Sequence, residues 1–267
     1  MRSGRCGRAM RASENVSPDW RDSAAYAQLL RADRSLLAWE WLRRDESYRR
    51  AATPRDREAG TGGPAAAGPG RWGLHAFEQP GSAVPRARPV WRAEVHPCVL
   101  PARAIEGAAG DCFELERLAP LCTLVDGGGG RQHLLICDGF RSIRIDILEG
   151  GIGEGRVRLH YLIAGFEAAE GPLLALRRLL ALRRAGRFCA SLHPSDSRAR
   201  RLVLMLRAYD ALAAGASQRE IAAVLLDGDA RRDRWRIHSP SLRSRAQRLA
   251  ACARAMGEGG YRALLAA

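Results

Sequence analysis

The sequence contains no lysine among its 267 residues, so each of its 43 basic side chains is an arginine. This absence excludes a Walker A phosphate loop and Schiff-base chemistry, because both need a lysine amine. The 29 acidic residues leave a formal charge of +14. A GC-rich genome accounts for arginine in place of lysine, but it does not account for the excess over acids. That excess indicates an anionic partner.

Long apolar runs and paired cysteines are also missing. No run reaches the roughly 18 apolar residues that span a bilayer, and the basic N-terminus has no apolar signal region. The seven cysteines are scattered without a CxxC pair, which disfavours a disulfide framework or a zinc ribbon. Acidic pairs such as Asp138 and Asp146 have no partner at a catalytic spacing and are interpreted as surface charges. We expect a reduced, cytoplasmic protein that is not an enzyme and uses no metal ion, cofactor or membrane.

The first quarter of the chain predicts a tail, a helical unit and a linker. Residues 1–17 are basic and poor in apolar side chains, as in a loose tail. Residues 18–50 place leucines and aromatic residues between charges as a small helical domain does, with Asp19 or Asp22 as the first cap. Residues 51–70 consist mostly of Gly, Pro and Ala, and this composition predicts a flexible linker.

Residues 71–190 predict a joining segment, a small antiparallel β-meander of four or five strands, and a connecting helix. Isoleucines at 143, 145 and 147 alternate with Arg144 and Asp146, the period-two pattern of a strand with one polar face. Asp126 with four following glycines predicts one hairpin turn, and Asp138 with Gly139 a second turn.

Two further stretches complete this region. The glycines of 150–155 lie between two strands and no lysine follows them, so we predict a flexible hairpin turn rather than a phosphate loop. Residues 171–186 have the apolar spacing of an amphipathic helix and end on a glycine. The whole pattern predicts an α+β protein.

Residues 191–267 predict a three-helix, helix-turn-helix-like DNA-binding domain. They hold 14 arginines and 7 acids, whereas residues 111–190 hold 11 and 10. A helix from Arg200 to Ala214 ends at Gly215, and Ser217 with Glu220 then fits a capping box. A capped short helix after a glycine is typical of the positioning helix of such units.

The last long helix is predicted to start near Ser239 and to bury an apolar stripe that includes Leu242 and Leu249. Its opposite face carries Arg and Gln, which read guanine and adenine edges, separated by small residues. Arg243 and Gln247 are expected to contact bases, and Arg248 and Arg219 to hold phosphates. The candidate DNA-binding residues are Gln218, Arg219, Arg234, Arg236, Ser239, Ser241, Arg243, Ser244, Gln247 and Arg248.

Two alternatives stay open for this segment. The basic helix face is also compatible with a plain solvated surface. The connection at 227–238 is longer than the three or four residues of a tight unit, and its arginines either lie near the DNA backbone or are loop charges.

The stretches GASQREIAAVLL and DRWRIHSPSLRSRAQRLAACARAMGEGGYRALL resemble the RovC-like transcription factor DNA-binding family. The N-terminal stretch PDWRDSAAYAQLLRADRSLLAWEWLRRDESYRRAA resembles the small transcriptional-regulator-like domain found ahead of it, and RWGLHAF and PVWRAEV resemble the joining segment. The resemblance spans about 18–265 and implies a DNA-binding transcriptional regulator. Relatives activate type VI secretion genes or excision genes of integrative conjugative elements, and the two-domain layout is similar to the second group.

The leading hypothesis is therefore a nucleoid-associated transcriptional activator that binds double-stranded DNA as a homo-oligomer. Its N-terminal helices would contact RNA polymerase or another regulator. One alternative is a protein-interaction module, such as an antiactivator or a scaffold in a mobile-element complex. Another is an RNA-binding protein, but the strands offer few exposed aromatic residues for base stacking.

Overall fold

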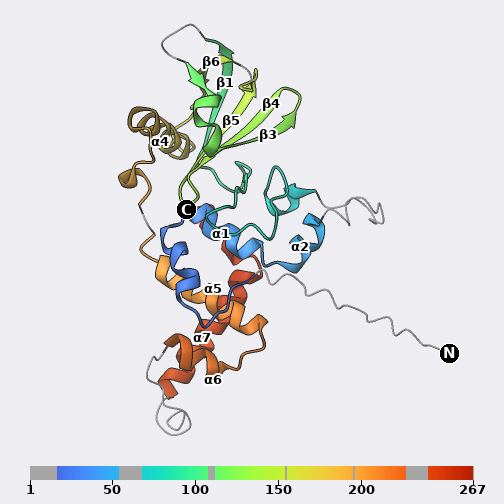
Figure 1. The fold of residues 1–267 in the computed structure, drawn as a ribbon, viewed down its shortest axis with the longest axis vertical. Coiled ribbons are helices and arrows are strands. Elements are labelled where there is room, and N and C mark those ends of the chain that lie inside the picture. The colour runs from blue at the N-terminus through green and yellow to red at the C-terminus, as the bar shows by residue number, and fades with distance from the viewer. Residues whose placement is uncertain are drawn as a thin grey trace, which may run out of the picture.

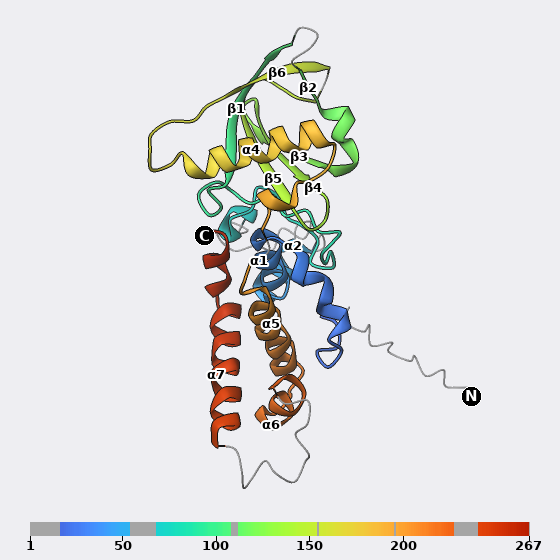
Figure 2. The same cartoon turned by 90° about the vertical axis from the view of Figure 1, so that its left-hand side faces the viewer.

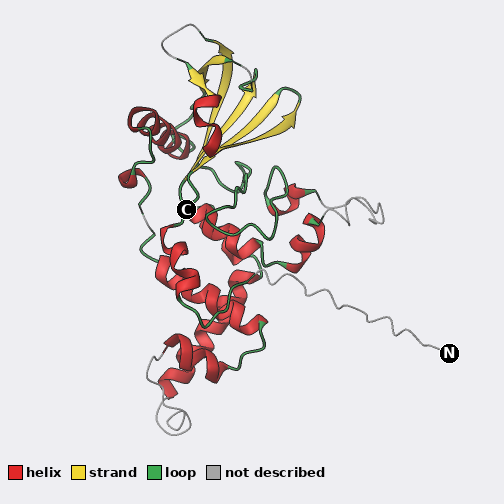
Figure 3. Cartoon of the chain, in the orientation of Figure 1, coloured by secondary structure: helices red, strands yellow, loops and turns green. Residues whose placement is uncertain are grey.

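The computed structural model describes residues 17–53, 68–107, 112–153, 155–194, 196–226 and 240–266. Two parts follow one another along the longest axis, a β-sheet at one end and a group of helices at the other (Figures 1 and 3). This mixed architecture confirms the predicted α+β class. Within the described ranges, no helix is both long and apolar enough to cross a membrane.

The sheet has six strands in the order β2-β6-β1-β5-β4-β3. The strands are β1 (Val99–Glu106), β2 (Phe113–Glu114), β3 (Cys122–Gly128), β4 (Arg131–Cys137), β5 (Ser142–Glu149) and β6 (Arg156–Tyr161). Strands β3, β4 and β5 form an antiparallel meander joined by the two predicted turns. The prediction of an entirely antiparallel meander is wrong, however, because β1 pairs in parallel with β5.

The glycine-rich stretch 150–155 is a crossover and not the predicted hairpin turn. Strand β6 pairs with β1 and β2 rather than with β5. Because β1 lies between β5 and β6 in the sheet, the connection from β5 to β6 crosses over the end of β1. Gly150 has φ = +82°, and a Cβ there would lie 2.1 Å from the carbonyl oxygen of Ala104 in β1. Only glycine tolerates both this conformation and this close approach.

Helix α4 (Glu170–Ala185) covers one face of the sheet (Figure 2). The three isoleucines of β5 form one hydrophobic cluster with Leu179 and Leu182 of this helix. The helix ends at Gly186, which has φ = +64°, as its sequence predicts. The amphipathic pattern of α4 is therefore explained by packing on the sheet.

The other face of β5 is also buried, which corrects the prediction of a polar, solvated face. Arg144 is 1% exposed and Asp146 is 8% exposed. The Arg144 side chain donates to the carbonyl oxygen of Trp91 at 3.1 Å and to Asp146 Oδ1 at 2.8 Å. Asp146, interpreted above as a surface charge, is thus the buried partner of an arginine. Trp91 belongs to an irregular segment between the helices and the sheet. Its side chains follow no helix or strand period, so the sequence does not predict that this segment covers β5.

The helical part combines both ends of the chain. The N-terminal elements are the 3₁₀ helix η1 (Ala24–Arg31), α1 (Arg34–Leu42), α2 (Glu46–Ala52) and the 3₁₀ helix η2 (Pro69–Trp72). The C-terminal elements are η4 (Ala190–Leu192), α5 (Ala199–Ala213), α6 (Gln218–Ile221), the π-helical turn η5 (Ala222–Leu226), α7 (Pro240–Gly257) and η6 (Gly260–Leu264). A further 3₁₀ helix, η3 (Leu115–Leu121), lies beside the sheet.

A single hydrophobic cluster joins these two sets of helices. It contains Trp39 and Trp41 of α1 together with Leu206 of α5 and Leu264 of η6. Residues Ser35–Leu42 are all buried, so α1 lies at the centre of the helical part and both tryptophans have the core role predicted for them. The expected tail and most of the expected linker, 1–16 and 54–67, lie outside the described residues.

Side-chain carboxylates cap α1 and α2 at their N-termini. Asp33 accepts a hydrogen bond from the backbone N–H of Leu36, and Asp45 accepts from Ser47 and Tyr48. Asp33 also accepts from the hydroxyl of Ser142 in β5, which attaches α1 to the sheet. The cap predicted at Asp19 or Asp22 concerns η1, whose N-cap is Ser23 and makes no side-chain capping bond. Asp22, one residue before it, accepts from the backbone N–H of Ala24 at 2.8 Å.

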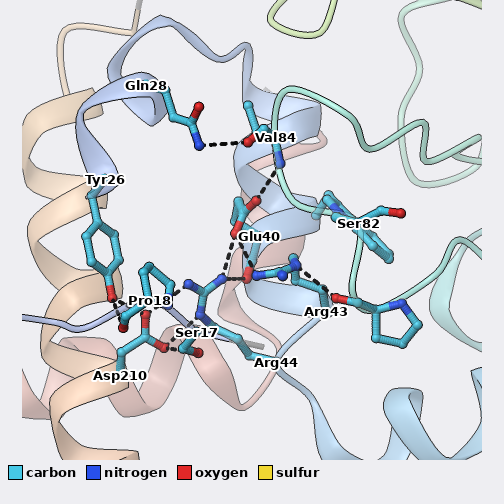
Figure 4. Close-up of polar contacts among 12 residues, drawn as sticks. Ser17, Pro18, Tyr26, Gln28, Glu40, Arg43, Arg44, Ser82, Val84 and Asp210 are labelled. Atoms are coloured by element: carbon cyan, nitrogen blue, oxygen red, sulfur yellow. Dashed lines mark hydrogen bonds and ion pairs between the residues drawn. The ribbon is translucent and has the colours of Figure 1, made fainter. Parts of the chain in front are cut away.

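A closed network of buried charges connects α1 with α5 (Figure 4). Arg44 donates to both carboxylate oxygens of Asp210, at 2.7 and 2.9 Å, and to Glu40 Oε2 at 2.7 Å. Arg43 donates to the same Glu40 oxygen at 3.2 Å, and the hydroxyl of Tyr26 donates to Asp210 at 2.7 Å. Burial alone would lower the pKa of Arg44, but the two carboxylates raise it above its usual value. Two acids therefore neutralise two arginines inside the core.

We expect Asp210→Ala to lower the free energy of unfolding by about 3–5 kcal/mol, because it leaves the buried Arg44 charge without its main partner. Urea unfolding monitored by circular dichroism measures this change. Glu46→Ala is the matched control, since it removes an exposed carboxylate that pairs with Arg50 and should change the stability little. Arg44→Met added to Asp210→Ala should recover part of the loss; equal stability of Asp210→Ala and Glu46→Ala would contradict the role of the network.

The shared core also determines whether the chain from about residue 90 can fold without its first 60 residues. Trp20, Tyr26, Trp39 and Tyr48 fill the cluster against which α5 packs. We therefore expect deletion of residues 1–60 to remove cooperative thermal unfolding of the helical part, because a large apolar surface of α5 becomes exposed. A truncated chain with a sharp calorimetric transition and unchanged helix content would show that the two parts are independent.

Candidate nucleic-acid interface

The short helix α6 begins at the predicted capping box. The hydroxyl of Ser217 accepts from the backbone N–H of Glu220 at 3.2 Å, and the Glu220 carboxylate accepts from the backbone N–H of Ser217 at 2.8 Å. Gly215, with φ = +77°, ends the preceding turn after α5. Two hydrogen-bonded donors at the N-terminus hold this helix start in one orientation.

Helix α7 buries the apolar stripe that its sequence predicts. Leu242, Ala246, Leu249 and Ala253 are buried, and Met256 is half-buried. The helix starts at Pro240, which suits a first helical turn because its missing N–H would have no partner there. Leu242 and Ala246 form a small cluster with Ala222 and Leu226, and this contact attaches α7 to η5.

Helices α5 and α7 lie side by side along the helical part (Figure 2). A Cβ added at Gly257, the last residue of α7, would lie 2.2 Å from the ring of Tyr209 in α5. That ring makes an edge contact with Trp41 at 5.5 Å between centroids. Gly257 therefore sets how closely the C-terminal end of α7 approaches α5 and, through Tyr209, α1.

The predicted DNA-binding residues fall into three groups. Exposed residues on α6 and α7 are Gln218, Arg219, Ser241, Arg243, Gln247 and Arg248. Ser244 is half-buried, and its hydroxyl accepts from Arg248 at 2.9 Å. Arg234, Arg236 and Ser239 lie outside the described residues. The structure thus brings the described candidates together at the end of the helical part that is far from the sheet (Figures 1 and 2).

The exposed face of α7 carries charge of one sign only. The helix contains Arg243, Arg245, Arg248 and Arg254 and no acidic residue. Arg245 is exposed beside the predicted set, although the sequence analysis left it out. Arg245 lies on the flank next to the buried stripe and not on the face opposite to it, so a selection of the opposite face does not include it. Four guanidinium groups along one helix favour a polyanion.

Comparison with known protein families bears on this arrangement. Residues 164–266 match the model of the RovC DNA-binding domain, described as a T6SS transcription factor DNA-binding domain. Residues 19–75 match the proteobacterial transcriptional regulator-like domain. No curated protein matches the chain.

The two matches define the chain as a DNA-binding transcriptional regulator. Its segment 164–266 is similar to the RovC DNA-binding domain, and its segment 19–75 is similar to the regulator-like domain. Both matches confirm the resemblance found in the sequence. The strands β1–β6 lie between the two matched segments.

Gly257→Ala tests whether the contact between α7 and α5 positions the candidate interface. We expect a loss of about 1–3 kcal/mol in the free energy of unfolding, because the new methyl group must displace the Tyr209 ring. Chemical denaturation followed by Trp fluorescence measures it. Gly153→Ala is the control, since a Cβ there meets no atom within 4 Å. If Gly257→Ala left the free energy of unfolding unchanged, α5 and α7 would tolerate a wider separation.

Proposed function

We propose that this regulator reads duplex DNA in a sequence-specific way with the N-terminal half of α7 in the major groove. The observation that carries the proposal is the acid-free, arginine- and glutamine-rich exposed face of α7 at the free end of the helical part. An α-helix fits the major groove of B-DNA, and Arg and Gln bond guanine and adenine edges there. Helix α6 with its capped N-terminus would act as the positioning helix of a helix-turn-helix-like unit.

The proposed roles differ along the interface. Arg243 and Gln247 lie one turn apart near the start of α7 and would contact bases, because the N-terminal turns of a recognition helix come closest to base edges. Arg219 and Arg248 would hold phosphates, and Gln218 and Ser241 lie at helix starts where N–H groups favour an anion. Arg234, Arg236 and Ser239, on the connection to α7, would follow the DNA backbone.

The printed name of the C-terminal family concerns transcription control of a secretion system. We propose that this chain activates genes of that kind, or genes for excision and transfer of a mobile element, as its two-domain layout favours. Exposed parts of η1 and α2 would contact RNA polymerase or another regulator. Leu173 and Leu180 of α4 are 45% and 38% exposed and would support self-association on DNA.

A protein-interaction module, such as an antiactivator or scaffold, is the second candidate. A surface for that purpose is expected to expose aromatic residues or leucines at its centre. The outer face of α7 instead exposes arginine, glutamine and alanine, and its leucines are buried. This composition favours nucleic acid over protein as the partner of α7.

Arg243→Ala should cost about 1–3 kcal/mol in binding to the operator and relax the preference at one base pair. The operator is first obtained by sequencing genomic fragments that the purified protein retains. Binding titrations then compare operator with scrambled DNA. Arg158→Ala on β6 removes the same charge from an exposed site in the sheet part, outside both matched segments, and should leave operator preference unchanged. Equal losses on both DNAs for Arg243→Ala would place α7 along the backbone instead of in the groove.

Salt dependence separates phosphate contacts from base contacts. With roughly five phosphates contacted, the slope of log affinity against log salt should be about −4 to −5. Arg219→Ala should weaken operator and scrambled DNA together and reduce the slope by about one unit, because one counterion fewer is released. Affinity that does not change with salt would contradict DNA binding through these arginines.

A further inference from the structure

Three side chains able to bind a metal ion meet on the face of the sheet opposite α4. His75 follows η2, His133 lies on β4 and Asp146 lies on β5, where it pairs in register with His133. One donor atom from each residue lies within 4.8 Å of the donor atoms of the other two. The sequence predicts no such site, because the three residues come from distant segments that only the fold brings together.

Asp146 orients His133 as carboxylates orient metal-binding histidines. The Asp146 carboxylate accepts from His133 Nδ1 at 2.8 Å and from Arg144 at 2.8 Å. A carboxylate acceptor places the imidazole proton on Nδ1, which leaves the lone pair on Nε2. Histidines that bind metal ions in proteins commonly have this arrangement, in which a carboxylate accepts from the ring nitrogen that does not bind the ion. Arg144 is held in turn by the carbonyl oxygens of Trp91 and Leu134.

His75 contributes a buried nitrogen without a hydrogen-bond partner. Its Nε2 is buried and bonds no described atom, and its ring stacks on His133 with 3.4 Å between centroids. A buried polar atom without a partner is rare in folded proteins and calls for a physical explanation. A metal ion bound to Nε2 would give this buried nitrogen a partner.

A pocket of about 560 Å³ opens beside the three residues and gives an ion a path from solvent. Its wall also carries the carboxylates of Glu94 and Asp126. His75, His133 and Asp146 all line this pocket, and binding through both Nε2 atoms requires the His75 ring to turn out of its stack on His133. Oxygen donors on the wall offer further ligands beside the two imidazoles.

We propose that the Nε2 atoms of His75 and His133, with Asp146 holding His133 in place, bind a divalent transition-metal ion of the Zn²⁺ class. Imidazole and carboxylate donors suit Zn²⁺ and Co²⁺, whereas Mg²⁺ and Ca²⁺ prefer oxygen alone. His75 is the last residue of the segment 19–75 that matches the regulator-like domain. His133 and Asp146 belong to the sheet. The ion would therefore clamp the segment that leaves the N-terminal domain to the sheet. The site is separate from α7, so it does not depend on the proposed DNA-reading role.

Titration of the full-length, chelator-treated protein with Co²⁺ and Zn²⁺ tests the proposal. We expect one Co²⁺ per chain with the visible absorption of nitrogen and oxygen ligands, displaced by Zn²⁺, and no thiolate charge-transfer band from the free cysteines. His75→Gln should weaken Co²⁺ binding by more than about 10- to 100-fold, because the loss of a residue that only orients a ligand already costs that much. His160→Gln is the matched control, because His160 is exposed on β6, and it should bind as the unchanged protein does.

Thermal unfolding gives a second readout that does not depend on DNA. Zn²⁺ that binds only the folded protein should raise the melting temperature of the unchanged protein and of His160→Gln, but not of His75→Gln. His75 is partly exposed, and circular dichroism shows whether this variant is folded. No saturable Co²⁺ binding, a thiolate band, or equal binding by folded His75→Gln would each overturn the proposal.

Discussion

The ion pair between Arg44 and Asp210 is the interaction on which the arrangement of the whole chain depends. It joins the residue just after the α1 C-cap to the last turn of α5, and both side chains are buried. A buried charge is costly unless its partner is held in place, so each of these groups requires the other. Glu40 and Arg43 extend the pair into a network of two acids and two arginines, and Glu40 also accepts from the backbone N–H of Val84. The network therefore fixes three segments relative to one another.

This constraint has consequences for how the two matched domains relate. The regulator-like segment does not lie apart from the DNA-binding segment, because α1 contacts η6 and α7 and shares one hydrophobic cluster with α5. Helix α1 is also attached to the sheet through Asp33 and Ser142. Any ligand or protein that shifts α1 would have to break buried charge pairs or move α5 and α7 with it. Physical coupling between the domains thus runs through a shared core and not through a flexible tether.

The sheet between the two matches has a structural role of its own. The centre of its α4 face is apolar, whereas its other face holds Arg144, Asp146 and His133 under an irregular segment. The guanidinium group of Arg144 donates to Asp146 and also to the carbonyl oxygens of Trp91 and Leu134, which belong to different segments. The sheet is thereby attached to the segment that leaves the regulator-like domain. Polar groups on this face select one register of that segment, because each buried donor needs its particular acceptor.

Features that depend on local spacing were predictable from the sequence. The strands β3, β4 and β5, the helix α4 with its glycine end, the capping box of α6 and the buried stripe of α7 all follow from side-chain period and turn residues. The basic face of α7 is local too, because a helix places Arg243 and Gln247 on one side wherever it lies. These signals act over a few residues, and neighbours in sequence are enough to produce them.

Tertiary structure alone decided which distant residues meet. Period two in β5 indicated a polar face, but only the covering segment made Arg144 and Asp146 a buried pair. The parallel pairing of β1 with β5, the contact of Arg44 with Asp210 and the meeting of His75 with His133 have no local signal either. Each depends on how whole elements pack, and a charged residue looks the same in sequence whether it faces water or a buried partner.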